Sequence, residues 1–292
     1  MNHLNKLLFV LLFVTNSMFS HMLWVNALQS KNYSPSSASV SIGWGHTTPI
    51  DDMLNSYNGK VNIKEFTLTS PDLKKINLRI PSSSLAIVKL KTKNFDVYDY
   101  DIALQKIAFN EKSKEGVYIL EAKSQETHLL KYIDTKNRTR LKFTSIDKTK
   151  NVQGVISSLQ GKRTAKAYIT LGKWKKIKPL KQGLELIPLN DLSKVKVGDL
   201  LSFNVLFYGE PLTSTSSMEY ITASSNTFGQ KEKFSLLSYI VDGKAQIRVQ
   251  SKGQWLISTT HKDEVQNNIK LKHLKNKVKT IEETTTLTFI VH

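Results

Sequence analysis

The chain has 292 residues, no cysteine and a formal net charge of +18. Disulfides, thiolate metal sites and cysteine-linked lipids are therefore excluded, and burial of an apolar core in one or two domains must hold the chain together. In a cytoplasmic protein this charge would indicate nucleic-acid binding. In an exported one it favours anionic envelope polymers or lipid headgroups, or a solubilising surface without a specific partner.

The first twenty residues have the layout of a signal peptide. Lys6 is followed by an unbroken apolar run, 7–14, and then by a short, mostly polar stretch, 15–20. This order of a basic start, a short apolar run and small residues is typical of exported proteins. The run is too short to cross a membrane, which takes about 20 apolar residues. We therefore expect residues 1–20 to be a signal peptide and the protein to be periplasmic.

The expected cleavage site decides which residue begins the mature chain. Cleavage after Ser20 would make His21 the first residue and would lower the net charge to +17, because Lys6 is the one charged side chain removed (18 − 1). Cuts after Ser17 and after Ala27 also satisfy the preference for small residues at the cleavage site. An uncleaved amino-terminal anchor is the remaining alternative.

Residues 21–135 read as a succession of short strands. Apolar and polar residues alternate with the period of half-buried strands in 38–44, 60–68, 75–80, 86–90 and 116–122. Ser-Pro, Ile-Pro and Asn-Gly pairs between them indicate turns. This pattern predicts an antiparallel β-sandwich as the amino-terminal domain.

Residues 136–182 differ in composition and are predicted to form a basic connecting segment. Within it, 151–159 fits a short helix. The stretch Lys162–Lys181 contains eight basic residues and no acidic one, with Tyr168 and Trp174 interleaved. We expect a solvated connecting hairpin there, with an anion-binding face as the alternative.

The strand rhythm returns in 183–292. Strands are predicted at 184–188, 200–207, 238–241, 245–249, 254–259 and 284–291. Asp242-Gly243 is a strong hairpin signal between two of them. The sequence thus predicts a second β-sandwich, and an all-β protein of two sandwich domains.

Common enzyme signatures do not occur in the sequence. There is no glycine-rich phosphate loop, no Gly-x-Ser-x-Gly elbow and no His-Glu-x-x-His pair. A catalytic triad can assemble from distant residues, but no spacing here favours one. We therefore expect a protein that is not an enzyme.

The histidines are the residues most able to carry chemistry. Of the seven, His3 lies in the predicted signal peptide and His292 ends the chain, while His128 and His273 lie in polar, lysine-rich surroundings. The other three, His21, His46 and His261, each adjoin a tryptophan-bearing strand. Neutral imidazole suits copper, nickel, cobalt and zinc, and an amino-terminal histidine adds its own amine. Three unrelated histidines are the alternative to a shared site.

Two carboxylates follow the second of these histidines closely. Asp51 and Asp52 could offset the overall positive charge near His46 or orient an imidazole from outside the ligand set. Their structural alternative is to cap a short turn before Met53.

Five segments, in order, resemble a bacterial family of exported proteins of unknown function, often labelled periplasmic components of cobalt or nickel uptake systems. They are His21–Asn26, Ile42–His46, Gly183–Leu189, Val205–Leu212 and Gly253–Ile257. The resemblance implies an immunoglobulin-like amino-terminal sandwich and a carboxy-terminal domain like the carboxypeptidase-regulatory or transthyretin fold. It also implies His21, His46 and His261 as metal ligands. The chain departs from the family in its reduced turn, Val241-Asp242-Gly243, and in its basic tail, 262–279.

The expected function is therefore binding of nickel, cobalt or copper in the periplasm, in support of uptake by a membrane metal transporter, with no nucleic-acid partner. The alternative is a non-catalytic envelope adaptor or a module that binds an anionic glycan through Lys162–Lys181 and Trp174. A third hypothesis is oxidative copper chemistry at an amino-terminal histidine, as in lytic polysaccharide monooxygenases.

Overall fold

The computed structural model describes residues 21–30, 36–56, 59–82, 87–213, 218–230 and 234–292. The predicted signal peptide, 1–20, lies outside these residues. Within the described part of the chain, no helix has the length and apolarity needed to cross a membrane.

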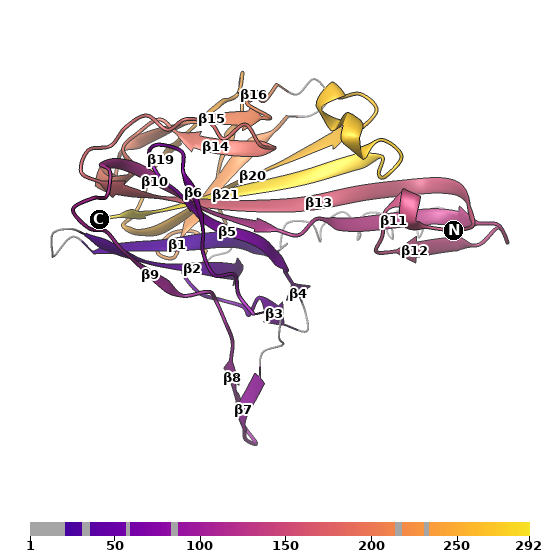
Figure 1. Cartoon of the computed structure of the whole chain (residues 1–292), viewed down its shortest axis with the longest axis horizontal. Helices are drawn as coiled ribbons and strands as arrows, with labels where there is room; N and C mark the ends of the chain where they lie inside the picture. The colour runs from indigo at the N-terminus through magenta and orange to yellow at the C-terminus, as the bar shows by residue number, and fades with distance from the viewer. Residues whose placement is uncertain (1–20, 31–35, 57–58, 83–86, 214–217, 231–233) are drawn as a thin grey trace, which may run out of the picture.

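One long sheet runs through the whole molecule, and both domains are built on it (Figure 1). Its strands follow the order β18-β17-β20-β21-β13-β10-β5-β6. Neighbours pair antiparallel, except that β13 and β21 run parallel. The bounds are β5 (Ile63–Thr69), β6 (Lys75–Asn77), β10 (Gly116–Ser124), β13 (Val152–Leu171), β17 (Tyr220–Ser225), β18 (Leu236–Tyr239), β20 (Gly253–Glu264) and β21 (Thr280–Val291).

The amino-terminal sandwich packs a small sheet against one end of the long sheet. The small sheet has the order β1 (Met22–Ser30), β2 (Ser37–Gly45), β9 (Gln105–Ala108). Its inward side chains, among them Leu23, Val25 and Ile42, meet Phe66 of β5 and Leu120 of β10 in one apolar core. Two short strand pairs branch from this domain: β3 (Asn55–Ser56) with β4 (Gly59–Lys60), and the projecting hairpin β7 (Ile87–Lys91) with β8 (Asp96–Asp99).

The carboxy-terminal sandwich uses the other end of the long sheet. Its second layer consists of β14 (Leu184–Pro188), β15 (Leu200–Phe207), β16 (Glu210–Pro211) and β19 (Lys244–Arg248). Trp255 and Ile257 of β20 pack with Phe203 and Val205 of β15 in a separate core. Short 3-10 helices, η3 (Leu192–Lys194) and η4 (Ile269–Leu274), lie within this domain. The all-β, two-sandwich prediction is confirmed.

Residues 136–182 correct the expectation of a connecting segment with a short helix at 151–159. They contain β12 (Thr139–Lys142), η2 (Ile146–Lys148) and β13, the strand that joins the two domains. The first half of β13 pairs with β11 (Thr127–Asp134) and its second half with β10, while β21 pairs with 159–167 on the other edge. Pairing with β11 satisfies backbone groups along 152–161, and this tertiary pairing overrides the local helical pattern.

Nor is Lys162–Lys181 a solvated hairpin. Lys166 lies between the domains and is almost fully buried, with Nζ 2.6 Å from Oε1 of Glu185 and 3.5 Å from Oε1 of Glu121. Glu185 also accepts hydrogen bonds from the backbone N–H groups of Leu180 and Lys181. A buried charge is tolerated only when it is paired in this way, so the lysine that looked like surface is a core residue.

The Asp242-Gly243 turn forms as predicted, but its strands part directly after it. Both residues have positive φ, 49° and 67°, as the tight hairpin turn requires. The two arms are joined by the bridge between Val241 and Lys244 and by a hydrogen bond from the N–H of Gln246 to Oγ of Ser238. Strand β18 then pairs with β17 in the long sheet, while β19 pairs with β15 in the other layer. The turn is thus a corner between two sheets, not a hairpin within one.

Candidate metal centre

His21 and His46 meet at the open end of the first hairpin. The register of β1 and β2 ends with Met22 opposite Gly45, so the next residues outward, His21 and His46, are neighbours. Their ring centroids are 4.5 Å apart, with the planes tilted by 48°. His21 keeps about a quarter of its side chain exposed and His46 less than half. The two imidazoles are therefore adjacent and reachable from solvent.

The two carboxylates beyond β2 turn back onto this histidine pair. Nε2 of His21 lies 3.1 Å from Oδ2 of Asp52. The backbone N–H of Asp52 donates to the carbonyl of Trp44, which holds the loop against the strand end. Asp52 therefore occupies the orienting position that its spacing suggested. Its Oδ1 also accepts from the N–H of Met53, so the expected turn cap forms as well.

Asp51 shapes the backbone at His46. Its Oδ2 accepts hydrogen bonds from the backbone N–H groups of His46, at 2.6 Å, and Thr47, at 3.2 Å. Gly45 makes this close approach possible, because it has φ +127° and a Cβ there would lie 2.5 Å from the same oxygen. Only glycine adopts such a backbone readily. The second glycine of the Gly-Trp-Gly-His segment is therefore required by the backbone conformation and by the close approach of Asp51.

The ring of Trp44 lies in contact with both His21 and Arg163. The ring of His21 stacks on Trp44, with centroids 5.3 Å apart and planes 17° from parallel. The guanidinium of Arg163 lies 5.6 Å from the centre of the Trp44 ring. Burial lowers the pKa of Arg163, although an arginine stays charged near neutral pH. The positive charge of Arg163 would repel a cation at the histidine pair, and the negative charges of Asp51 and Asp52 would offset this repulsion.

His261 lies on the other face of the long sheet. On β21, the hydroxyls of Thr286 and Thr288 donate to backbone carbonyls of β1, so the even-numbered residues of β21 face the amino-terminal sandwich. His261 pairs with Glu283, and directly opposite residues share a face. Its side chain therefore points away from His21, and the structure does not bring the third predicted ligand to the pair.

The surroundings of His261 are those of a structural histidine. Its Nδ1 lies 2.6 Å from Oε1 of Glu219, and both side chains are buried. Its ring meets that of Phe207 edge-on, with centroids 4.5 Å apart. It also lines a cavity of about 230 Å³ together with Asp263 and Lys270. Across the described residues, no group of three or more His, Cys, Asp or Glu side chains is arranged to hold a metal.

The tryptophans of the strands that adjoin the three histidines lie in separate places. Trp44 contacts His21, but Nε1 of Trp24 donates to the carbonyl of Pro49. Trp255 belongs to the carboxy-terminal core, where it stacks on Phe228. One tryptophan of the three therefore supports the histidine pair.

The β13 part of the alternative anion-binding stretch does not form one face. Lys166 is buried between carboxylates, Lys162 lies 3.5 Å from Glu283, and Arg163 lies over Trp44. Trp174 packs edge-on against Tyr168. The three basic residues of β13 thus point to different places, and Trp174 is partly buried, while the lysines of 173–181 are exposed.

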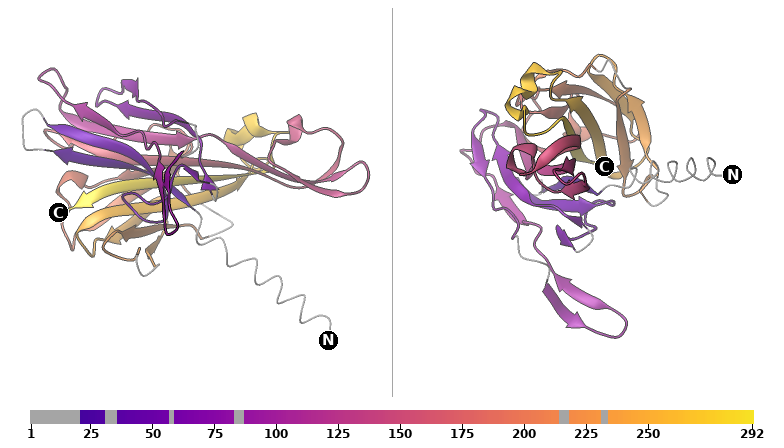
Figure 2. Two further views of the ribbon diagram at one scale, coloured as in Figure 1. Left: turned by 90° about the horizontal axis from the view of Figure 1, so that it is seen from below. Right: turned by 90° about the vertical axis from the view of Figure 1, so that its right-hand side faces the viewer.

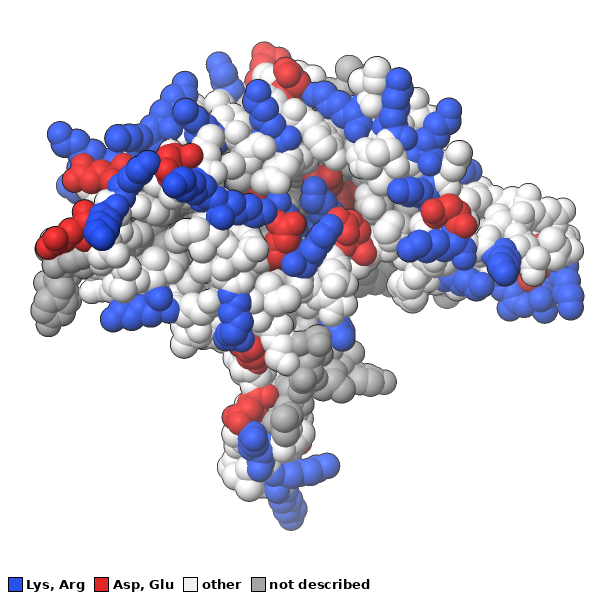
Figure 3. Space-filling model, in the orientation of Figure 1, with Lys and Arg blue, Asp and Glu red and all other residues white. Residues whose placement is uncertain are grey.

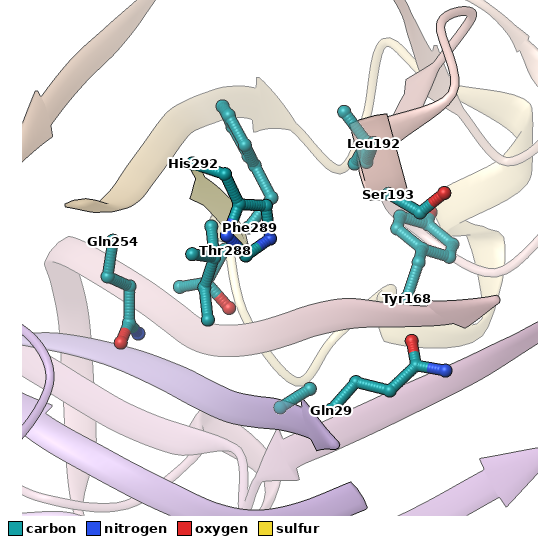
Figure 4. Close-up of a pocket in the computed structure, with 10 residues that line it drawn as sticks. Gln29, Tyr168, Leu192, Ser193, Gln254, Thr288, Phe289 and His292 are labelled. Atoms are coloured by element: carbon teal, nitrogen blue, oxygen red, sulfur yellow. The ribbon is translucent and has the colours of Figure 1, made fainter. Parts of the chain in front are cut away.

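A further cavity, of about 270 Å³, opens where the ends of β1, β13 and β21 meet (Figure 4). Its lining includes Gln29, Tyr168, Ser193, Gln254 and His292. Burial raises the pKa of Tyr168, and the nearby Glu185 and Glu121 raise it further. None of the three predicted ligands lines this cavity, so it is separate from the histidine pair.

Fold and site together define an all-β protein of two sandwiches on a common sheet, with a histidine pair at the end of its first hairpin. A family model described as a domain of unknown function (DUF4198) matches residues 18–263, and the chain belongs to this family. This agrees with the resemblance to a family of unknown function. No curated protein and no solved structure matches the chain.

Proposed function

We propose that this protein binds one divalent transition-metal ion, nickel, cobalt or copper, at His21 and His46, and that it does so in the bacterial periplasm in support of metal uptake. The observation that carries the proposal is the 4.5 Å approach of the two imidazoles, next to Asp52. Imidazole nitrogen is the ligand these metals share. The pair is partly exposed, as exchange of an ion with a transporter requires.

Two imidazoles are a weak site, and the signal peptide suggests the missing donor. Cleavage after Ser20 would turn the backbone nitrogen of His21 into a free α-amino group. That amine and Nδ1 of the same residue would close a six-membered chelate ring on the metal. With Asp52 accepting from Nε2–H, Nδ1 carries the lone pair that chelation needs. His46 would supply the third nitrogen. In this proposal, the metal site is complete only after the signal peptide has been removed during export.

The roles of the remaining residues follow from their contacts. Asp52 fixes the tautomer and ring orientation of His21, as carboxylates do for metal-binding histidines. Asp51 holds the backbone of His46 in place through two N–H groups. Trp44 limits water on one side of the His21 ring. His261 has no part in this proposal, since it lies on the opposite face of the sheet.

The proposal is tested by native mass spectrometry of protein exported by a bacterial host. The purified protein is exposed in turn to copper, nickel, cobalt and zinc, and one spectrum reports both the mature amino terminus and the bound ions. We expect a chain beginning at His21 that retains one ion, most strongly copper according to the usual affinity order. A chain that begins elsewhere, or one that retains no ion, would contradict the proposal.

A further inference from the structure

A three-stranded lobe extends beyond both sandwiches. It is formed by β11, β12 and the first half of β13 (Figures 1 and 2). Strand β11 is the centre of the lobe, paired with β12 on one edge and with β13 on the other. The lobe therefore has two faces, and side chains alternate between them along each strand.

One face of the lobe is covered. Leu130 and Tyr132 of β11 point to this face and are buried. The backbone N–H of Ile146, in η2, donates to the carbonyl of Lys277, just past η4. The two 3-10 helical segments are thus joined at the lobe. This hydrogen bond ties the lobe to the carboxy-terminal domain.

The other face is open and carries large apolar side chains. Leu129 stands opposite Leu159, and Lys131 stands opposite Leu141. Leu141 is 60% exposed, and Phe143, directly after β12, is 86% exposed. Exposed apolar residues that share one face of a sheet indicate an interaction surface more strongly than the same residues scattered singly.

The same lobe is strongly basic. Residues 127–158 contain seven Lys or Arg and two Asp, a net charge of +5 (7 − 2). One of the acids is neutralised locally, since Asp134 accepts hydrogen bonds from Arg138 and Arg140, whose contacts help to lower its pKa. Figure 3 shows the blue side chains gathered at the end of the molecule where β11 and β12 lie. Charge and exposed apolar area therefore coincide on one projecting element.

We propose that the open face of this lobe docks on an anionic phospholipid bilayer. Phe143 and Leu141 would enter the boundary between headgroups and acyl chains, while Lys131 and Lys136 meet lipid phosphates. An anionic bilayer binds both kinds of side chain: its acyl region accepts apolar groups, and its headgroups attract lysines. A soluble anionic polymer would use the lysines but would leave Phe143 in water. Docking of this kind holds the protein at a membrane surface without any membrane-spanning segment.

Co-sedimentation with lipid vesicles tests the proposal. The protein is mixed with vesicles that contain phosphatidylglycerol and, separately, with vesicles of phosphatidylcholine alone. We expect binding to the anionic vesicles that weakens as salt is added. The double variant Leu141→Ser, Phe143→Ser should bind at least about tenfold more weakly. Equal binding to both kinds of vesicle, or no binding to either, would overturn the proposal.

The β7–β8 hairpin offers a matched control. Leu90 is 51% exposed and Phe95 is 60% exposed, so Leu90→Ser, Phe95→Ser removes the same side chains from another projecting element. We expect this variant to bind vesicles like the unchanged protein. A loss as large as that of the lobe variant would show that the bilayer does not select the lobe. Circular dichroism should show both variants folded, because all four side chains are exposed.

A charge variant separates a bilayer from a polymer. Lys131→Gln, Lys136→Gln should weaken binding about thirtyfold at low salt, at about fivefold for each lysine. If this variant loses binding while Leu141→Ser, Phe143→Ser keeps it, the surface recognises anionic charge alone. That outcome would identify a polyanion as the partner and contradict bilayer docking.

Discussion

The imidazole of His21 lies 4.5 Å from that of His46, ring centre to ring centre, because both residues flank the last pair of the β1–β2 ladder. The hairpin register brings them together, and Asp51 holds the backbone of His46. The stack of His21 on Trp44 and the contact of its Nε2 with Asp52 then fix the orientation of one ring.

Substitution of His46 should remove the metal and leave the fold. In the variant His46→Ala we expect no ion retained in native mass spectra, because one of the three proposed nitrogens is lost. Stability should change little, since 44% of the His46 side chain is exposed. The control is His273→Ala, which removes an exposed histidine of η4. Retention of the ion by His46→Ala, or its loss from His273→Ala, would disagree with the proposed site.

The two neighbouring carboxylates should act differently. Asp52→Asn is expected to weaken metal affinity about tenfold to a hundredfold, because the partner that orients His21 is lost. Asp51→Asn should chiefly loosen the loop, because Asp51 accepts from the N–H groups of His46 and Thr47. Titration calorimetry measures the first effect and amide hydrogen exchange the second. Equal losses of affinity would show that Asp51 acts on the metal as well.

Affinity should also fall in acid. Ligand nitrogens must give up their protons before they bind a metal, so binding competes with protonation. Free histidine titrates near pH 6.5, and we expect the retained ion to be lost as the pH falls below about 6. Titrations at a series of pH values measure this. Binding that is equally tight at pH 5 and pH 7 would point to carboxylate ligands instead.

The buried lysine between the domains should be worth several surface ion pairs. Lys166→Met leaves Glu185 buried without its cation and Glu121 paired with Lys123 alone, and we expect it to lower the unfolding free energy by about 3–5 kcal/mol. The matched control is Lys262→Met, which breaks an exposed pair with Glu282 and should cost at most about 1 kcal/mol. Urea denaturation compares the two. Similar losses of unfolding free energy in the two variants would show that the buried ion cluster stabilises the fold no more than an exposed ion pair does.

Asp101 should contribute stability that disappears in acid. Hydrogen bonds from Arg79, and the backbone N–H groups of Ser82 and Ala103, lower the pKa of Asp101 to about 2. Its unfolded value is near 3.9. The contribution is therefore complete above about pH 4 and is lost as the pH falls towards about 2.

The variant Asp101→Asn tests this predicted loss of stability in acid. It should lower the unfolding free energy by about 1–2 kcal/mol at neutral pH, a range that allows for solvent screening of a partly exposed pair. The difference from the unchanged protein should vanish near pH 2. A difference that stayed constant over that range would show that the carboxylate charge has no part in it.

Much of the fold could be predicted because alternation of apolar and polar residues is a local signal. Strands β2, β5, β10, β15 and β20 lie where alternating or continuous apolar patterns placed them. Strand β13 was missed because its pairing is non-local: β10, β11 and β21 all contribute partners. The same limit explains why the Asp242-Gly243 turn was recognised while the separation of β18 from β19 was not.

The candidate site was predictable where sequence neighbours suffice. His21, His46 and Asp52 belong to one hairpin and the loop after it, so their approach follows from local order. His261 is different: a strand places its side chain on one face or the other, and only the register with β21 decides which. Arg163 carried no signal at all, since its position over Trp44 depends on how two sheets pack.

The most direct test of the metal site compares two amino termini. One preparation begins at His21, and the other carries a single glycine before it, so that the α-amino group is displaced from the chelate ring. We expect the first to bind one copper ion and the second to bind about a hundredfold more weakly, which corresponds to about 3 kcal/mol. Equal affinities would contradict the proposed chelate of amine and imidazole at His21.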